Sequence, residues 1–165
     1  EIMPSLVGSE MCIRDRPKAK YAKKRLVHVD HLMLYRPLFA VGATVTLRTD
    51  SKPLRDYALG QFAAAGYDTL WVSDDVRRDH PELPETEYEC RTREIGAAVY
   101  GICATPGAQP SDEQLAAGRA QEQSLACYLP DNLDELTYVP LGMEEAVENF
   151  RNRARKGKKR LPQES

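Results

Sequence analysis

Three short runs of β-branched and aromatic residues along the chain predict three β-strands. They lie at residues 43–50, 67–73 and 97–105, and turn residues bound each of them. Residues 74–85 between the last two runs form a polar loop with two prolines, and no strong helical pattern fills the rest of that interval. Two strands joined in this way are expected to pair as an antiparallel hairpin.

Two segments with apolar residues at helical spacing flank the first predicted strand. Residues 30–39 place apolar side chains near helical spacing behind Asp30, which can cap a helix, although Pro37 weakens the last turn. Residues 51–66 carry a second stripe that stops at Gly66. The order of helix, strand, helix, strand, loop, strand indicates half of an α/β sheet, with an edge strand and apolar faces left uncovered.

The last third of the chain predicts a helical extension over residues 108–165. After a linker at residues 106–110, a capping-box pattern predicts a helix over residues 111 to about 129. A turn-rich stretch then leads to a final helix at residues 142–156, which is acidic at its start and basic at its end, as the helix dipole prefers.

Composition is typical of one globular domain. The chain has 165 residues, of which 42% are hydrophobic and 29% charged, and no apolar run approaches the about 20 residues that a membrane span needs. Its four cysteines form no metal-type spacing, which favours reduced thiols and a cytoplasmic location. A metal site at His28 and His31 is a remote alternative, because that pair lacks further ligands, and no metal is predicted.

Charge is balanced overall but segregated along the chain. The 23 Lys and Arg residues nearly match the 25 Asp and Glu residues, yet residues 18–25 are basic, residues 112–148 are acidic and residues 151–160 are basic again. Such segregation favours a local anionic partner. For residues 151–160, an RNA-phosphate contact and a merely solvated tail both stay open.

Residues 17–26, which we call the basic segment, carry the densest positive charge. Five of its ten side chains are cationic, none is anionic, and Tyr21 lies among them. Because cations neutralise phosphates and an aromatic ring can stack, this composition is typical of a nucleic-acid contact. A solvated run of charge is the alternative interpretation.

Asp50 and residues 86–89 are candidates for a polar site. Asp50 ends the first predicted strand, and ligands of open α/β sheets bind beyond the carboxyl ends of strands, although Asp50 can also cap the following helix. Thr86 and Glu89 place a hydroxyl and a carboxylate three residues apart. That spacing suits a ligand site, but a helix capping box is the favoured interpretation.

Taken in order, the basic segment, the strand that ends in Asp50 and residues 86–89 resemble the C-terminal half of bacterial tRNA (guanine-N7)-methyltransferases. The resemblance covers about residues 17–105. It implies an α/β fold over residues 17–107, namely the C-terminal half of a class I, Rossmann-like methyltransferase sheet. It also implies S-adenosyl-L-methionine as cofactor, tRNA as partner and methylation of guanosine 46 in the tRNA variable loop.

The resemblance further implies roles for single residues. Lys18 matches a substrate-contacting lysine, and Asp50 matches a substrate-binding aspartate. The family's RNA-interacting segment corresponds to Lys20, Tyr21, Lys23, Lys24 and Arg25. Its Thr-x-x-Glu substrate motif corresponds to Thr86, Glu87, Tyr88 and Glu89. Many members carry His where this chain has Tyr21, which leaves a ring that can stack in place of a titratable group.

Two parts of the family's pattern are not matched. Residues 1–16 resemble the translation of a DNA-sequencing library adapter, and the catalytic aspartate would fall four residues before Lys18, at Arg14. Asp15 does not inherit that role, so no catalytic residue is assigned. The Gly-rich turn that holds S-adenosyl-L-methionine belongs to the family's other half. We therefore expect a C-terminal fragment that is inactive alone, and a non-catalytic RNA-binding module is the alternative.

Overall fold

The computed structural model describes residues 17–133, 136, 138–140 and 142–158. The adapter-like segment and Arg14 lie outside the described residues. In chain order the elements are η1 (Ala19–Lys24), α2 (Val29–Tyr35), η2 (Arg36–Leu38), β1 (Val45–Thr49), α3 (Lys52–Ala64), β2 (Tyr67–Ser73), α4 (Val76–Asp79), α5 (Glu87–Glu94), β3 (Tyr100–Pro106), α6 (Asp112–Ala120), η3 (Leu125–Tyr128) and α7 (Glu144–Lys158). Within these ranges no helix combines the length and the apolar character needed to cross a membrane.

The three strands form one sheet in the order β1-β3-β2, and β3 runs antiparallel to both neighbours. The predicted antiparallel pairing of the last two strands is confirmed, but the expectation of no strong helix between them is wrong, because α4 and α5 lie there. β1 and β2 therefore run parallel to each other and are joined by α3. The pairs Thr49↔Tyr100 and Ser73↔Gly101 bring the ends of β1 and β2 to one edge of the sheet, which we call the carboxyl edge.

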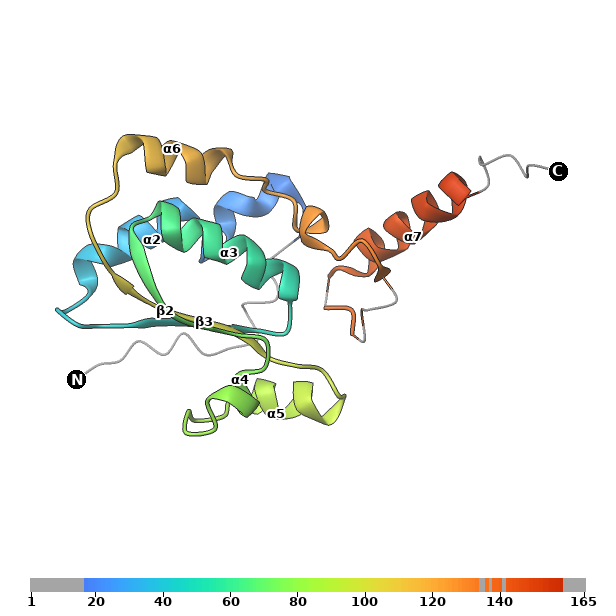
Figure 1. Cartoon of the computed structure of the whole chain (residues 1–165), viewed down its shortest axis with the longest axis horizontal. Coiled ribbons are helices and arrows are strands. Elements are labelled where there is room, and N and C mark those ends of the chain that lie inside the picture. The colour runs from blue at the N-terminus through green and yellow to red at the C-terminus, as the bar shows by residue number, and fades with distance from the viewer. Residues whose placement is uncertain (1–16, 134–135, 137, 141, 159–165) are drawn as a thin grey trace.

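Helices cover both faces of this sheet. Figure 1 shows α2, α3 and α6 on one face and α4 and α5 on the other. Leu47 of β1 is buried in the core that α3 shares with the sheet. Since side chains alternate along a strand, Arg48 points to the opposite face, and there its guanidinium meets Glu89 of α5.

The extension contributes to the same core as α3. Its buried apolar side chains are Leu125, Leu129, Leu133, Met143 and Val147. α6 also lies close to α3 at Gly118, where an added Cβ would lie 2.6 Å from the Cβ of Ala64. The two helices can approach this closely because Gly118 has no side chain. The extension is thus packed into the fold.

Helix ends account for most of the differences from the sequence prediction. The capping box at Ser111 is confirmed, but its helix ends at Ala120, and η3 follows where the helix was predicted to continue. The N-cap of α2 is His28 and not Asp30, because Nδ1 of His28 accepts the Asp30 N–H at 3.2 Å and Asp30 already lies inside the first turn.

Asp50 is not the N-cap of α3, which was the alternative interpretation of this residue. Ser51 is the N-cap, and its Oγ accepts the N–H of Leu54 at 3.3 Å. Thr49 Oγ1 in turn accepts the N–H of Ser51 at 3.1 Å. Asp50 therefore takes no part in capping, and its carboxylate is left for other partners at the carboxyl edge.

Candidate nucleic-acid interface

The basic segment presents its lysines to solvent. Residues 19–24 form the 3-10 helix η1, which repeats about every three residues, so Ala22 and Arg25 face inward together. The lysines on the outer side are exposed, namely Lys18, Lys20, Lys23 and Lys24. Two of their ammonium groups flank the Tyr21 ring, with Lys20 Nζ at 4.9 Å and Lys24 Nζ at 6.0 Å from its centre. Such a surface can neutralise phosphates.

Arg25 differs from the predicted RNA contact, because the structure buries it completely, at 0% exposure. Its Nη1 donates to the carbonyl of Gln123 at 2.7 Å and its Nη2 to the carbonyl of Pro17 at 3.2 Å. Its guanidinium also lies 4.7 Å from the centre of the Tyr57 ring. In this fold Arg25 anchors the basic segment, and we leave it out of the RNA-contacting set.

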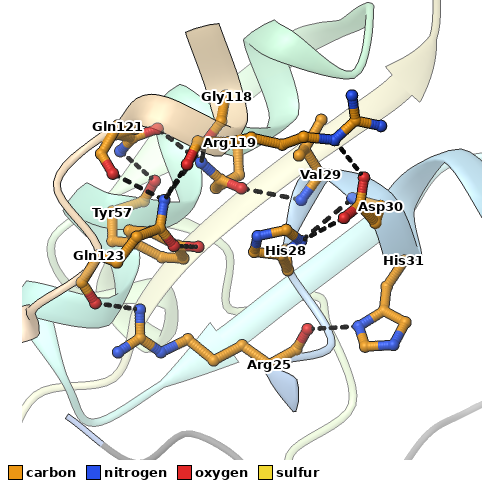
Figure 2. Close-up of polar contacts among 11 residues, drawn as sticks. Arg25, His28, Val29, Asp30, His31, Tyr57, Gly118, Arg119, Gln121 and Gln123 are labelled. Atoms are coloured by element: carbon orange, nitrogen blue, oxygen red, sulfur yellow. Dashed lines mark hydrogen bonds and ion pairs between the residues drawn. The ribbon is translucent and has the colours of Figure 1, made fainter. Parts of the chain in front are cut away.

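A network of polar side chains ties the basic segment to α3 and to the extension, as Figure 2 shows around Tyr57, Gln121 and Gln123. The Tyr57 hydroxyl donates to Gln123 Oε1 at 2.9 Å, and Gln121 Nε2 donates to the Tyr57 carbonyl at 3.0 Å. Burial raises the pKa of Tyr57 to about 12. Gln61, which is fully buried, accepts the N–H of Val29 at 2.8 Å and donates to the Gly118 carbonyl at 2.7 Å.

Asp50 lies at the carboxyl edge with 6% of its surface exposed. Its Oδ2 accepts a hydrogen bond from the hydroxyl of Tyr138 at 2.8 Å. Tyr138 belongs to the extension, so a residue 88 positions further along the chain reaches the predicted substrate-binding aspartate. Sequence reasoning missed Tyr138, because nothing in the turn-rich stretch around it distinguishes this tyrosine from the others.

Residues 86–89 form the capping box that the sequence favoured. Glu89 Oε2 accepts the N–H of Thr86 at 2.7 Å, and Thr86 Oγ1 accepts the N–H of Glu89 at 3.2 Å. Within the same motif Glu87 is exposed and pairs with Arg91, and Tyr88 is 36% exposed. Capping therefore uses the Thr86 hydroxyl and only one of the two carboxylate oxygens of Glu89.

The carboxylate of Glu89 keeps one oxygen without a hydrogen bond. Glu89 is 5% exposed, and Arg48 Nη1 lies 3.1 Å from each of its oxygens, but only the contact to Oε2 has hydrogen-bond geometry. Arg48 is itself held by the carbonyl of Pro84 at 2.8 Å. Within the part of the chain that the structure describes, Glu89 Oε1 has no hydrogen-bond partner. A buried polar atom left in this way is costly unless a ligand or water meets it.

Glu89 lines a cavity of about 250 Å³ on the α4 and α5 side of the sheet. Its lining is charged and apolar, comprising Asp75, Val76, Arg77, Arg78, Glu85, Glu89, Arg93, Ala97 and Val99. The carboxylate of a residue that lines such a cavity can accept an N–H from a ligand, and the apolar lining residues Val76, Ala97 and Val99 can pack against a flat ring. The cavity thus joins an acceptor to a space for a small planar group.

The structure places the two predicted substrate carboxylates with separate partners. Asp50 is held by Tyr138, whereas Glu89 is held by Arg48 and by the Thr86 backbone. Arg48 was also missed in the sequence analysis. A single charged residue inside a β-branched strand was a usable signal, because a charged side chain at such a position is usually paired. Lys18, the predicted substrate lysine, pairs with Glu145 of α7 at 3.0 Å.

Half of the chain is similar to curated proteins named tRNA (guanine-N(7)-)-methyltransferase. The one from Alkaliphilus oremlandii is 33% identical over 85 residues, which is 51% of this chain and 40% of that protein. The one from Streptococcus equi subsp. zooepidemicus (strain MGCS10565) is 30% identical over 90 residues, or 54% and 43% of the two chains. The one from Bacillus subtilis is 29% identical over 85 residues, or 51% and 40%.

These relatives confirm the resemblance predicted from the sequence, which fits a partial protein of this kind. The chain spans about 40% of the length of the curated relatives it matches. No protein family model matches the chain.

Proposed function

We propose that this chain is the C-terminal part of a tRNA (guanine-N7)-methyltransferase, and that the intact enzyme methylates guanosine 46 in the variable loop. The observation that carries the proposal is the buried Glu89, which lines a cavity that could hold a planar base and whose Oε1 lacks a hydrogen bond. The names of the curated relatives support the reaction type. The parallel pair β1 and β2, joined by α3 and covered on both faces, supports a class I, Rossmann-like sheet.

The chemistry proposed for Glu89 is recognition and charge stabilisation. Guanine N7 already carries an in-plane lone pair, so its attack on a methyl group needs alignment and no general base. A carboxylate oxygen can accept from the N1–H and N2–H groups of guanine, whereas adenine would leave that acceptor unpaired. Because N7 methylation makes the ring cationic, a nearby carboxylate also stabilises the developing charge.

The remaining residues of the proposed site hold the RNA. The exposed lysines, Lys18, Lys20, Lys23 and Lys24, neutralise phosphates, and the Tyr21 ring stacks on a base. Asp50 contacts the target nucleoside from the carboxyl edge, while Thr86, Glu87 and Tyr88 keep Glu89 in place or touch the substrate. The proposal places the protein in the cytoplasm, with tRNA as its partner.

The methyl donor implied by the family is S-adenosyl-L-methionine. The described residues do not fit it, because the turn after β1 leads through Asp50 directly into the Ser51 cap and Pro53, without the Gly-rich approach that a nucleotide cofactor needs. We therefore assign the donor site to the part of the intact enzyme outside this chain. By the same argument the chain alone is inactive in methyl transfer.

The test of this division of labour is Glu89→Gln in the intact enzyme. Glutamine keeps the capping box but presents an N–H₂ group to the donors of guanine. We expect kcat/KM for methylation to fall about 100-fold, as when one preorganised transition-state contact is lost, while the Kd for tRNA stays within about twofold. Glu94→Gln, at an exposed position of the same helix and outside the proposed site, is the matched control and should change neither value.

Equal losses in methylation and in tRNA binding would contradict the role given to Glu89, and so would unchanged methylation. A non-catalytic RNA-binding module remains a second candidate, because the described residues combine a basic surface with no donor-binding turn. The gene sequence upstream of Pro17 separates the two. The family resemblance implies a Pro-Asp-Pro-Trp motif with the catalytic aspartate just before Pro17. Finding that motif, preceded by a strand and a Gly-rich turn, favours the enzyme. An intact reading frame that lacks these features favours the RNA-binding module.

A further inference from the structure

The extension contacts two of the three parts of the chain that the proposed function assigns to the substrate, namely the basic segment and Asp50. Leu125 N–H donates to the carbonyl of Pro17 at 2.9 Å, and Glu145 pairs with Lys18 at 3.0 Å, so the start of the basic segment is held from two sides. At the carboxyl edge the Tyr138 hydroxyl meets Asp50 Oδ2 at 2.8 Å. The extension lies outside the residues that carry the resemblance, and the sequence predicted none of these three contacts.

We infer that Tyr138 is a positioning residue, which fixes the carboxylate of Asp50 in the orientation that receives the target guanosine. The inference rests on the proposed function, because it takes Asp50 to be a substrate contact. It adds a residue from the extension to the substrate site.

Tyr138 can fix the orientation of the Asp50 carboxylate because Asp50 is buried. A carboxylate that is 6% exposed has little water to orient it, so its rotation about the Cβ–Cγ bond depends on the donors around it. A hydrogen bond to Oδ2 holds the plane of the carboxylate, and a hydrogen bond to a charged acceptor is among the stronger ones in proteins. Without that donor, the carboxylate can turn away from a ligand at little cost.

Core residues stand before and after Tyr138 in the chain. Leu133 before it is 8% exposed and Met143 after it is 2% exposed, and both belong to the main core. The N–H of Met143 donates to the carbonyl of Pro140 at 3.0 Å, which closes the turn that leads into α7. Tyr138, which meets Asp50, thus stands in the chain between two described residues of the main core.

A purely structural role predicts a different outcome from a positioning role. If Tyr138 only satisfies a buried carboxylate, its loss lowers stability and affects all RNA ligands alike. If it positions Asp50 for the nucleoside, its loss lowers discrimination between guanosine and other bases. Discrimination is a ratio of two affinities measured on one variant, so the fraction of folded protein cancels.

The experiment measures the Kd of the full 165-residue chain for two tRNA transcripts that differ only at the variable-loop target, guanosine in one and adenosine in the other. We expect Tyr138→Phe to lower the ratio of the two Kd values about tenfold or more, the size expected for one hydrogen bond to a charged group. The control is Tyr128→Phe, another hydrogen-bonded tyrosine of the extension, which contacts Gln121 and should keep the ratio unchanged. In an Asp50→Asn background, Tyr138→Phe should have no further effect on the ratio.

An unchanged ratio in Tyr138→Phe, with guanosine still preferred, overturns the inference and leaves the proposed function standing. A full effect of Tyr138→Phe in the Asp50→Asn background overturns it too, because the two residues would then act separately. Absence of tRNA binding, or of any guanosine preference, in the unsubstituted chain overturns both the inference and the substrate role given to Asp50.

Discussion

Gln61 is the side chain whose replacement should separate the extension from the rest of the fold. Its side chain is 0% exposed and carries three hydrogen bonds to two other segments. Oε1 accepts the N–H of Val29 at the start of α2, while Nε2 donates to the carbonyl of Gly118 in α6 at 2.7 Å and to Gln121 Oε1 at 2.8 Å. Gln61→Leu keeps the volume and removes all three.

The expected cost follows from the backbone groups left behind. The Val29 N–H and the Gly118 carbonyl both belong to the backbone, so they stay in the variant: the N–H loses its acceptor, and among the described residues the carbonyl keeps only the hydrogen bond from Gln123 Nε2 at 3.4 Å. A buried polar group without a partner costs about 1–3 kcal/mol, so the free energy of unfolding should fall by at least that amount. Since a domain is stable by about 5–15 kcal/mol in total, this is a large fraction.

Urea unfolding followed by the fluorescence of Trp71, the single tryptophan, measures the loss. The midpoint should fall by about 1 M or more, since urea m-values of small proteins are about 1–3 kcal/mol per M. Gln109→Leu, at an exposed position, is the matched control and should shift the midpoint by less than about 0.3 M. A loss below about 1 kcal/mol in Gln61→Leu would refute the reasoning, because the extension would then not depend on this network.

Two further predictions concern pH and salt. Burial, which outweighs the nearby Asp30 carboxylate, holds the pKa of His28 below its usual value of 6.5. As pH falls through 6.5, the unfolded chain binds a proton that folded His28 resists, so stability should fall. His28→Asn keeps a capping side chain and should flatten the decrease in melting temperature between pH 7.5 and 5.5, and an unchanged decrease would exclude His28 as its source. Replacing Lys20 and Lys23 together by Gln should reduce the slope of log K against log salt for tRNA binding by about 1.5, whereas Lys52→Gln should leave it nearly unchanged. A double variant with the original slope would show that these lysines do not contact phosphate.

The elements of the fold could be predicted where a local pattern decides them. The β-branched run before Asp50, the stripe that stops at Gly66 and the Ser111 capping box each need only neighbouring residues, and each lies within a few positions of the observed element. Gly66 takes a φ of +71°, which glycine tolerates best, so its role as a helix stop was readable from the sequence. The antiparallel pairing of the last two strands was predicted because no strong helix was expected between them. The pairing is confirmed, although α4 and α5 lie in that interval.

Other features depend on contacts between distant segments. The helix after Ser111 ends at Ala120 because the chain then turns to bury Leu125 against α3, which no local pattern encodes. The cap of α2 was assigned to Asp30 because Asp is the commoner cap, yet His28 takes the position. The contact between Tyr138 and Asp50 joins residues 88 positions apart, which no local pattern indicates.

In the candidate interface, too, the sequence predicts the kind of partner but not which side chains contact it. Composition predicts that residues 17–26 meet an anion, but it treats all five cations alike. The three-residue repeat of η1 turns Arg25 inward with Ala22 and leaves the lysines outside. Burying a guanidinium costs several kcal/mol unless its donors are met, and here the carbonyls of Gln123 and Pro17 accept them. The buried Arg25 thus anchors the basic segment, and the four lysines remain on the surface that can contact RNA. The composition therefore predicts the kind of partner, whereas the three-residue period of η1 decides which side chains can contact it.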